Sequence, residues 1–386
     1  MDKAIHAILQ MIRSEVCGNA DGIGGLTSFS EDGLNELYQL SKKHDLCHIV
    51  GNALDKKGLL TEGDPISENF KKQIFKAVWR YEKQKFELER VCGILEGAEI
   101  RHMPLKGSVL RNYYPEPWLR TSCDIDILVA EEDLERAVAA INADGGYKVG
   151  LKDSHDISLY SAAGVHIELH YDLVEDGRVA DATRILREVR QYCVPVEGCV
   201  YRMRATDEFF YFYHMAHMAK HFKAGGCGIR TLIDEWILDH TVSYDKSVRD
   251  ALLSEAGLLT FADGIRRLSE VWFSGAESDA ITEKLHKYIV DGGVYGNQAN
   301  RVAVWTARKN DNKFKYLCSR VFESYDALKF RYPILQKHRW LMPVMQVRRW
   351  FGLLKGNKAK RAISEVQTLG AVNTDGVNEF LREIGL

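Results

Sequence analysis

The sequence lacks any apolar run of the roughly 18 to 20 residues that a membrane-spanning helix needs, because charged residues interrupt its longest apolar stretches. The N-terminal residues MDKAIHAILQMIRSEV also lack the continuous apolar region of a secretory signal peptide. We therefore expect no transmembrane segment and a cytoplasmic location.

Cysteine pairs at the spacing used by metal sites are also missing. The eight cysteines are scattered along the chain, and none of them forms a CxxC pair. Several stand among apolar neighbours, where a reduced thiol simply packs. The sequence predicts neither a disulfide framework nor a structural zinc site.

The chain has little net charge, −2 at pH 7, but the charge is unevenly placed. Residues 301–361 hold 16 Lys or Arg against three acids, and they include aromatic residues such as Trp340. Such a composition suits a polyanion-binding surface, although it could equally complement the acidic remainder of the chain. Nucleic acid is the less favoured partner, because no recognised RNA-binding module is present. Residues 345–359 could also lie on an anionic membrane as a basic amphipathic helix.

Apolar residues make up 46% and charged residues 27% of the 386 residues, which is typical of a folded protein with two or three domains. Helical periodicity dominates both ends of the chain, and Pro65 opens a long helix that runs to about Leu95. The pattern between these ends is strand-like in residues 100–105, 123–129, 147–151, 157–160, 165–171 and 199–203.

Helices alternate with these strands at first, but the later connections have hairpin length. This order predicts an α+β fold with a mixed sheet rather than a doubly wound one. We expect an N-terminal helical segment at residues 1–60, a catalytic core at 61–205 and a larger C-terminal helical domain at 206–386.

Two carboxylates two positions apart are the sharpest feature. Asp124 and Asp126 lie on one predicted strand and must project from the same face. Their flanking residues are apolar, so unpaired charges there would be costly and a cation should neutralise them. Glu168, on the alternating strand HIELH, supplies a third acid. Because Mg²⁺ prefers carboxylate oxygens and nucleotide polymerisation chemistry uses two such ions, we expect two Mg²⁺ ions here, with Mn²⁺ as an alternative.

A glycine and a hydroxyl, Gly107 and Ser108, stand at a predicted strand-to-helix turn upstream of these acids. Backbone N–H groups at such a turn can bind phosphate oxygens. Lys106 and Arg120 could add positive charge, the alternative being ordinary surface charge that contributes little.

Histidines recur near the predicted site. His166 and His170 share the face of Glu168, so they either line the cleft or pack. His214, His217 and His221 recur at helical spacing, for which cleft lining or packing is favoured over zinc binding.

Arg230 and Asp234 stand four residues apart after a glycine-rich bend. They are expected to form an ion pair within one helix, although Arg230 could instead reach a nucleotide phosphate at the cleft.

The order of Gly107-Ser108, Asp124-x-Asp126 and Glu168 resembles the signature of the DNA polymerase β superfamily, which is hG[GS], a D-x-[DE] strand and a third strand acid. Four blocks are similar to successive blocks of a bacterial family of uncharacterised nucleotidyltransferases: HMPLKGSVLRNYYPEPWLRTSCDIDILV, HIELHYDL, HMAHMAKHFKAGGCGIRTLIDE and YPILQKHRWLMPVMQVRRW. The resemblance covers roughly residues 35–350. One departure is the gap between Gly107 and Asp124, which is longer than in polymerase β and contains two prolines.

This resemblance implies a polymerase β-like core that binds a nucleoside triphosphate and transfers a nucleoside monophosphate to an acceptor with release of pyrophosphate. It implies that Asp124 and Asp126 bridge two metals, that Glu168 holds the catalytic metal and assists deprotonation of the acceptor, and that Ser108 contacts the triphosphate. The acceptor would be a small molecule or a protein hydroxyl, with RNA less favoured. The alternative is a catalytically silent protein that uses the nucleotide pocket for sensing.

Overall fold

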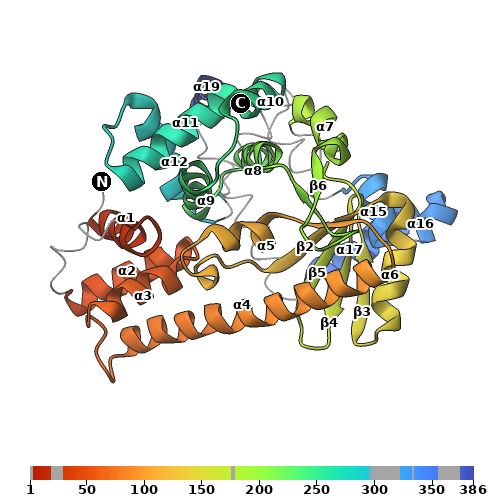
Figure 1. Ribbon diagram of the computed structural model, residues 1–386, viewed down its shortest axis with the longest axis horizontal. Helices are drawn as coiled ribbons and strands as arrows, with labels where there is room; N and C mark the ends of the chain where they lie inside the picture. Colours follow the sequence, from red (N-terminus) through yellow and green to blue (C-terminus); the bar gives the residue numbers. More distant parts are fainter. Residues whose placement is uncertain are drawn as a thin grey trace.

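A computed structural model describes residues 3–18, 29–174, 179–294, 322–332, 334–354 and 374–386, together with Gly296. Helices such as α4 and α6 cover one mixed sheet, and a second group of helices, which includes α8 to α12, lies above it in the view (Figure 1). The elements up to the end of the sheet are α1 (Lys3–Val16), α2 (Glu31–Lys43), α3 (Cys47–Lys56), α4 (Pro65–Gly97), β1 (His102–Pro104), α5 (Lys106–Leu110), β2 (Asp124–Val129), α6 (Leu134–Ala143), β3 (Tyr147–Lys152), β4 (Asp156–Ser161) and β5 (His166–His170). Those that follow are α7 (Ala180–Arg187), β6 (Cys193–Pro195), β7 (Met203–Ala205), α8 (Asp207–Phe222), α9 (Arg230–Thr241), α10 (Lys246–Glu255), α11 (Leu259–Ser269), α12 (Ala280–Gly292), α15 (Tyr325–Arg331), α16 (Ile334–Lys337), α17 (Met342–Leu354) and α19 (Thr374–Glu383).

Helix α4 is the long helix expected after Asp64. The Asp64 side chain accepts a hydrogen bond from the backbone N–H of Ser67, and Pro65 occupies the first helical position. Its first half packs on α3, and its second half presents apolar residues such as Val91 and Leu95 to the sheet. The helix runs along one edge of the molecule (Figure 1).

The sheet is mixed, as predicted. Its strand order is β1-β2-β5-β4-β3, and β2 runs parallel to β5 while the other neighbours are antiparallel. One face carries Ile125, Ile127 and Ile167, which form a hydrophobic cluster with α4 and α6. Because side chains alternate along a strand, the residues between them point to the opposite face, towards α8.

The helices at the two ends of the chain share a second hydrophobic cluster. It contains Ile8 and Ile12 of α1 together with buried residues of α8, α9, α11 and α12. Arg13 adds a polar contact, since its Nε lies 2.6 Å from the carbonyl oxygen of Trp272. The N-terminal helices therefore pack against the helical part that follows the sheet, and the domain boundaries remain a prediction.

The strand predicted around residues 199–203 begins later than expected, because β7 starts at Met203 and runs to Ala205. β7 forms a short hairpin with β6, and residues 199–202 lie in the connection between the two strands. The carboxylate of Glu96 accepts the backbone N–H groups of Val200, Tyr201 and Arg202, at distances from 2.6 to 3.1 Å. These donors are therefore satisfied by a side chain at the end of α4, which strand periodicity does not reveal.

Within the described part of the chain, no helix combines the length and the apolar character that a membrane crossing needs. Residues 301–321, 333 and 355–361 of the basic stretch lie outside the described residues.

Candidate active site

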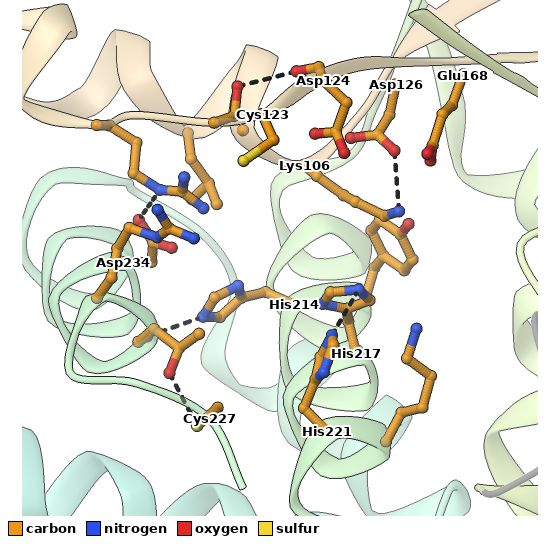
Figure 2. Close-up of a pocket in the computed structure, with 18 of the residues that line it drawn as sticks. Lys106, Cys123, Asp124, Asp126, Glu168, His214, His217, His221, Cys227 and Asp234 are labelled. Carbon is orange, nitrogen blue, oxygen red and sulfur yellow. Dashed lines mark hydrogen bonds and ion pairs between the residues drawn. The ribbon is translucent and has the colours of Figure 1, made fainter. Parts of the chain in front are cut away.

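Three carboxylates meet on the polar face of the sheet. Asp124 and Asp126 lie two residues apart on β2, so their side chains leave the strand on the same side. Glu168 is the register partner of Asp126 on the parallel strand β5, which places its carboxylate on that side as well. Figure 2 shows the three groups next to one another at one wall of a pocket. The acids therefore form one cluster in space.

The two aspartates differ in their electrostatic surroundings. Burial raises the pKa of Asp124, and the charges of Asp126 and Glu168 raise it further. Burial alone would also raise the pKa of Asp126, but Lys106 and His170 hold the pKa of this carboxyl below its usual range. Lys106 Nζ lies 3.0 Å and His170 Nε2 lies 2.8 Å from Asp126 Oδ1. Asp124, by contrast, faces like charges that a bound cation would offset.

The donor atoms of this cluster suit a hard divalent cation. Asp124, His166 and Glu168 each offer a ligand atom, and these atoms lie within 4.8 Å of one another. Asp126 and His170 form a second such group with the same Glu168. Carboxylates contribute two of the three ligands in each group, and Mg²⁺ and Mn²⁺ prefer carboxylate oxygens. Two groups that share an acid also fit a pair of ions.

Helix α8 forms the wall of the pocket opposite the carboxylates (Figure 2). The pocket has a volume of about 300 Å³. His217 Nε2 and His221 Nε2 lie 3.3 Å apart on this wall, next to Lys220 and Tyr213. Burial, together with the charge of Lys106, lowers the pKa of Lys220 to about 7. One wall of the pocket therefore carries carboxylates, and the facing wall carries imidazole and ammonium groups.

A comparison with known protein families matches residues 30–274 to a family described as an uncharacterised nucleotidyltransferase. The chain belongs to this family. The match extends from the residue before α2 to the turn after α11, so it includes the carboxylate cluster and the facing helix α8. No match to the chain was found among curated proteins.

In this member of the family the Gly107-Ser108 turn is closely packed. A Cβ atom at Gly107 would lie 3.0 Å from Ser122 Cβ, so glycine lets α5 approach the segment that leads into β2. Lys106 and Gly107 line the pocket. Ser108 is buried within α5 and is not among the described residues of the pocket lining. Contact between Ser108 and a triphosphate therefore stays an expectation.

The two arginines of the predicted site line the pocket, but each is tied to an acid elsewhere in the chain. Arg120 Nε lies 2.6 Å from Oδ1 of Asp234, a fully buried residue. The predicted ion pair between Arg230 and Asp234 is wrong, because Arg230 Nη1 lies 3.0 Å from Asp45 Oδ2 instead. The turn between α2 and α3 brings Asp45 to this position, which the sequence does not reveal.

The histidines of α8 face the pocket. His217 and His221 contact each other there, whereas His214 Nε2 lies 3.2 Å from the carbonyl oxygen of Thr231. Among the described residues, none of the clusters of side chains that could hold a metal ion contains any of these three histidines. His155, which no pattern in the sequence singled out, also lines the pocket.

A buried polar network behind the site carries no recognisable motif in the sequence. Arg111, which is almost fully buried, donates hydrogen bonds to the carbonyl of Gly107, to Gln84 Oε1 at 2.9 Å and to Ser122 Oγ at 2.7 Å. Gln84, on α4, donates in turn to the Ser122 carbonyl at 3.2 Å. Arg111 thus fixes α5 against the segment before β2. Because two of these three partners lie 11 and 27 residues away, periodicity could not identify them.

Proposed function

We propose that this chain is a metal-dependent nucleotidyltransferase, of EC 2.7.7 type, that transfers a nucleoside monophosphate from a nucleoside triphosphate to an acceptor hydroxyl. The observation that carries the proposal is the cluster of Asp124, Asp126 and Glu168 at the pocket of a chain from a nucleotidyltransferase family. Two acids on one strand and a third on its parallel neighbour also favour a polymerase β-like core.

The three acids are the groups that would hold two Mg²⁺ ions, or Mn²⁺. When bound, these ions supply charge neutralisation for the triphosphate and favour the ionised form of the acceptor hydroxyl. Glu168 stands next to Asp126 and is our candidate to receive the proton of that hydroxyl. The acceptor oxygen forms a bond to the α-phosphorus, the bond from the α-phosphorus to the bridging oxygen breaks, and that electron pair leaves with pyrophosphate.

The nitrogen-rich side of the pocket is our candidate for the rest of the triphosphate. Lys106 lies beside Asp126, and Lys220 lines the facing wall. Because burial lowers the pKa of Lys220 to about 7, an incoming polyphosphate would favour its charged form. Gly107 and Arg120 also line the pocket and are further candidates for phosphate contact.

The acceptor is proposed to be a small molecule or a protein side chain that bears a hydroxyl group. The alternative function is a sensor that binds nucleotide in the same pocket without catalysis. Three closely placed acids favour the enzyme, because nucleotide binding alone does not require paired metal sites.

The test is incubation with Mg²⁺ and each nucleoside triphosphate labelled at the α-phosphate, with cell extract as the source of acceptor. We expect release of pyrophosphate and a labelled product. Asp124→Asn and Glu168→Gln should each reduce the rate by roughly 100-fold or more. Glu135→Gln, at an exposed acid on α6, is the matched control and should retain full activity. Nucleotide binding without release of pyrophosphate from the triphosphate, whichever acceptor is present, would favour the sensor.

A further inference from the structure

The outer face of α4 carries bulky aromatic residues that remain exposed. Phe75 is 69%, Trp79 is 56% and Phe86 is 66% exposed. They follow one another at spacings of four and seven residues, so they lie on one side of the helix. An exposed row of large apolar side chains of this kind marks an interaction site. We call this row and the basic residues around it the α4 stripe; its members are Lys71, Lys72, Phe75, Lys76, Trp79, Arg80, Lys83, Lys85 and Phe86.

The α4 stripe is strongly basic in a chain whose net charge is −2. From Lys71 to Phe86 the sequence has six basic residues and one acid, Glu82. Lys83 Nζ lies 4.2 Å from the centroid of the Trp79 ring, so positive charge also covers one aromatic face. A second copy docked through the same face would set lysine against lysine, which disfavours a symmetric dimer. Charge complementarity therefore calls for an anionic partner.

We propose that the α4 stripe docks this protein on an anionic lipid bilayer. Phe and Trp rings insert at the boundary between headgroups and acyl chains, while neighbouring lysines bind the anionic headgroups. Phe75 and Phe86 are about 16 Å apart along the axis of α4 and lie on the same side of it. The helix itself runs along one edge of the molecule (Figure 1).

Two features favour a bilayer over nucleic acid as the partner. Five of the six cations are lysines, which act as point charges, whereas recognition of nucleic acid favours the bidentate guanidinium of arginine. The stripe also lies on the outer side of a helix, and one face of the Trp79 ring is already covered by Lys83. A strand of unpaired bases needs open ring faces in a groove or on a flat platform.

Docking through α4 would leave the pocket accessible. Helix α4 covers the apolar face of the sheet, whereas the carboxylate cluster lies on the opposite face, towards α8. Membrane attachment would thus hold the enzyme at a surface with its active site directed away from the lipid. This inference does not depend on nucleotide transfer.

The test is flotation of the full chain with vesicles of phosphatidylcholine alone and with vesicles that contain about one-third phosphatidylglycerol. We expect binding to the anionic vesicles at low salt and its loss at high salt. Joint replacement Lys72→Gln and Lys76→Gln should weaken partitioning by roughly 25-fold, since each cation near an anionic surface contributes about fivefold. Joint replacement Phe75→Ser and Trp79→Ser should also weaken it.

The matched control joins Leu151→Ser with Lys148→Gln, which remove an exposed apolar and an exposed basic residue from β3. This variant should bind vesicles like the wild type, and circular dichroism should show that all variants are folded. Equal binding to neutral and anionic vesicles, or no binding to either, would overturn the proposal. Binding of a single-stranded oligonucleotide that the stripe variants abolish, without vesicle binding, would assign the surface to nucleic acid instead.

Discussion

Lys106 combines a strained backbone with the charge balance of the pocket. Its φ of +44° lies in the left-handed region, which costs a residue with a side chain about 1 to 2 kcal/mol. The conformation accompanies an ammonium group 3.0 Å from Asp126 Oδ1 at the first residue of α5. Asp126 is thus kept ionised by protein groups, while Asp124 is crowded by like charges. In the proposed metal site, Asp126 would offer an ionised carboxylate, and a bound cation would offset the like charges around Asp124.

Replacement of Lys106 by methionine tests this arrangement. Without divalent cations, Lys106→Met should lower the free energy of unfolding by about 3 kcal/mol, because the buried charge of Asp126 loses its ammonium partner. Mg²⁺ should restore more stability to this variant than to the wild type, since the ion would take over the lost neutralisation. Thermal melts in EDTA and in Mg²⁺ measure both effects. The idea fails if Lys106→Met and the wild type melt at the same temperature in EDTA. Lys148→Met, on exposed β3, is the control and should have no effect.

At the scale of elements, two arginines hold together three segments around the entrance to β2. Arg120 pairs with Asp234 of α9 and also donates to the carbonyl of Thr121 at 2.5 Å. Arg230 of α9 donates to the same carbonyl at 3.2 Å and pairs with Asp45 in the turn before α3. The segment that leads into β2 is therefore fixed to both helical parts of the molecule. Movement of α9 would displace the residues next to Asp124.

A double-mutant cycle at the Arg120–Asp234 pair measures this connection. Arg120→Met should lower the free energy of unfolding by about 3 to 5 kcal/mol, because it leaves the fully buried Asp234 without its cation. Adding Asp234→Asn to this variant should restore part of the loss, since the second change removes the unpaired charge. Chemical denaturation gives all four values. Arg136→Met, at an exposed pair with Asp133, should change stability by less than about 1 kcal/mol. Additive losses at Arg120 and Asp234 would mean that the two groups are not coupled.

At the scale of the whole molecule, a buried acid makes stability depend on pH. Glu235 lies in the hydrophobic cluster shared by the N-terminal and C-terminal helices, and it is fully buried. Tyr211 donates a hydrogen bond to its Oε1 at 3.1 Å. Burial, together with the nearby charge of Asp239, raises the pKa of Glu235 from 4.5 to about 7. The folded state therefore holds this proton more tightly than the unfolded chain does.

The sign of the pH effect follows from this pKa. The contribution of Glu235 to stability is fully present below pH 4.5 and is lost as the pH rises through about 7. Glu235→Gln stays neutral, so its stability relative to the wild type should increase by on the order of 3 kcal/mol between about pH 5 and about pH 8. Denaturation at both pH values measures this change. Glu135→Gln, at an exposed acid, should show no such trend. Parallel stability curves for wild type and Glu235→Gln would contradict the shifted pKa.

Local backbone geometry allowed part of this structure to be predicted from the sequence alone. Side chains alternate along any strand, so Asp124 and Asp126 had to share a face, and Pro65 at a helix start predicted α4. The sheet is mixed, as predicted, and in it Glu168 of β5 lies beside Asp126 of β2. The family pattern that the sequence resembles already contained a third strand acid.

Tertiary structure alone decided the partners of the charged side chains. Arg120 pairs with Asp234, and Arg230 pairs with Asp45. Arg111 and the carboxylate of Glu96 form hydrogen bonds with polar groups that are distant in the sequence. A long charged side chain can reach many neighbours, and which one it meets depends on how remote helices and strands come together. Periodicity describes one element at a time and carries no information on that packing. The sequence therefore determined which acids form the cluster, and the packing of the helices on the sheet determined what surrounds it.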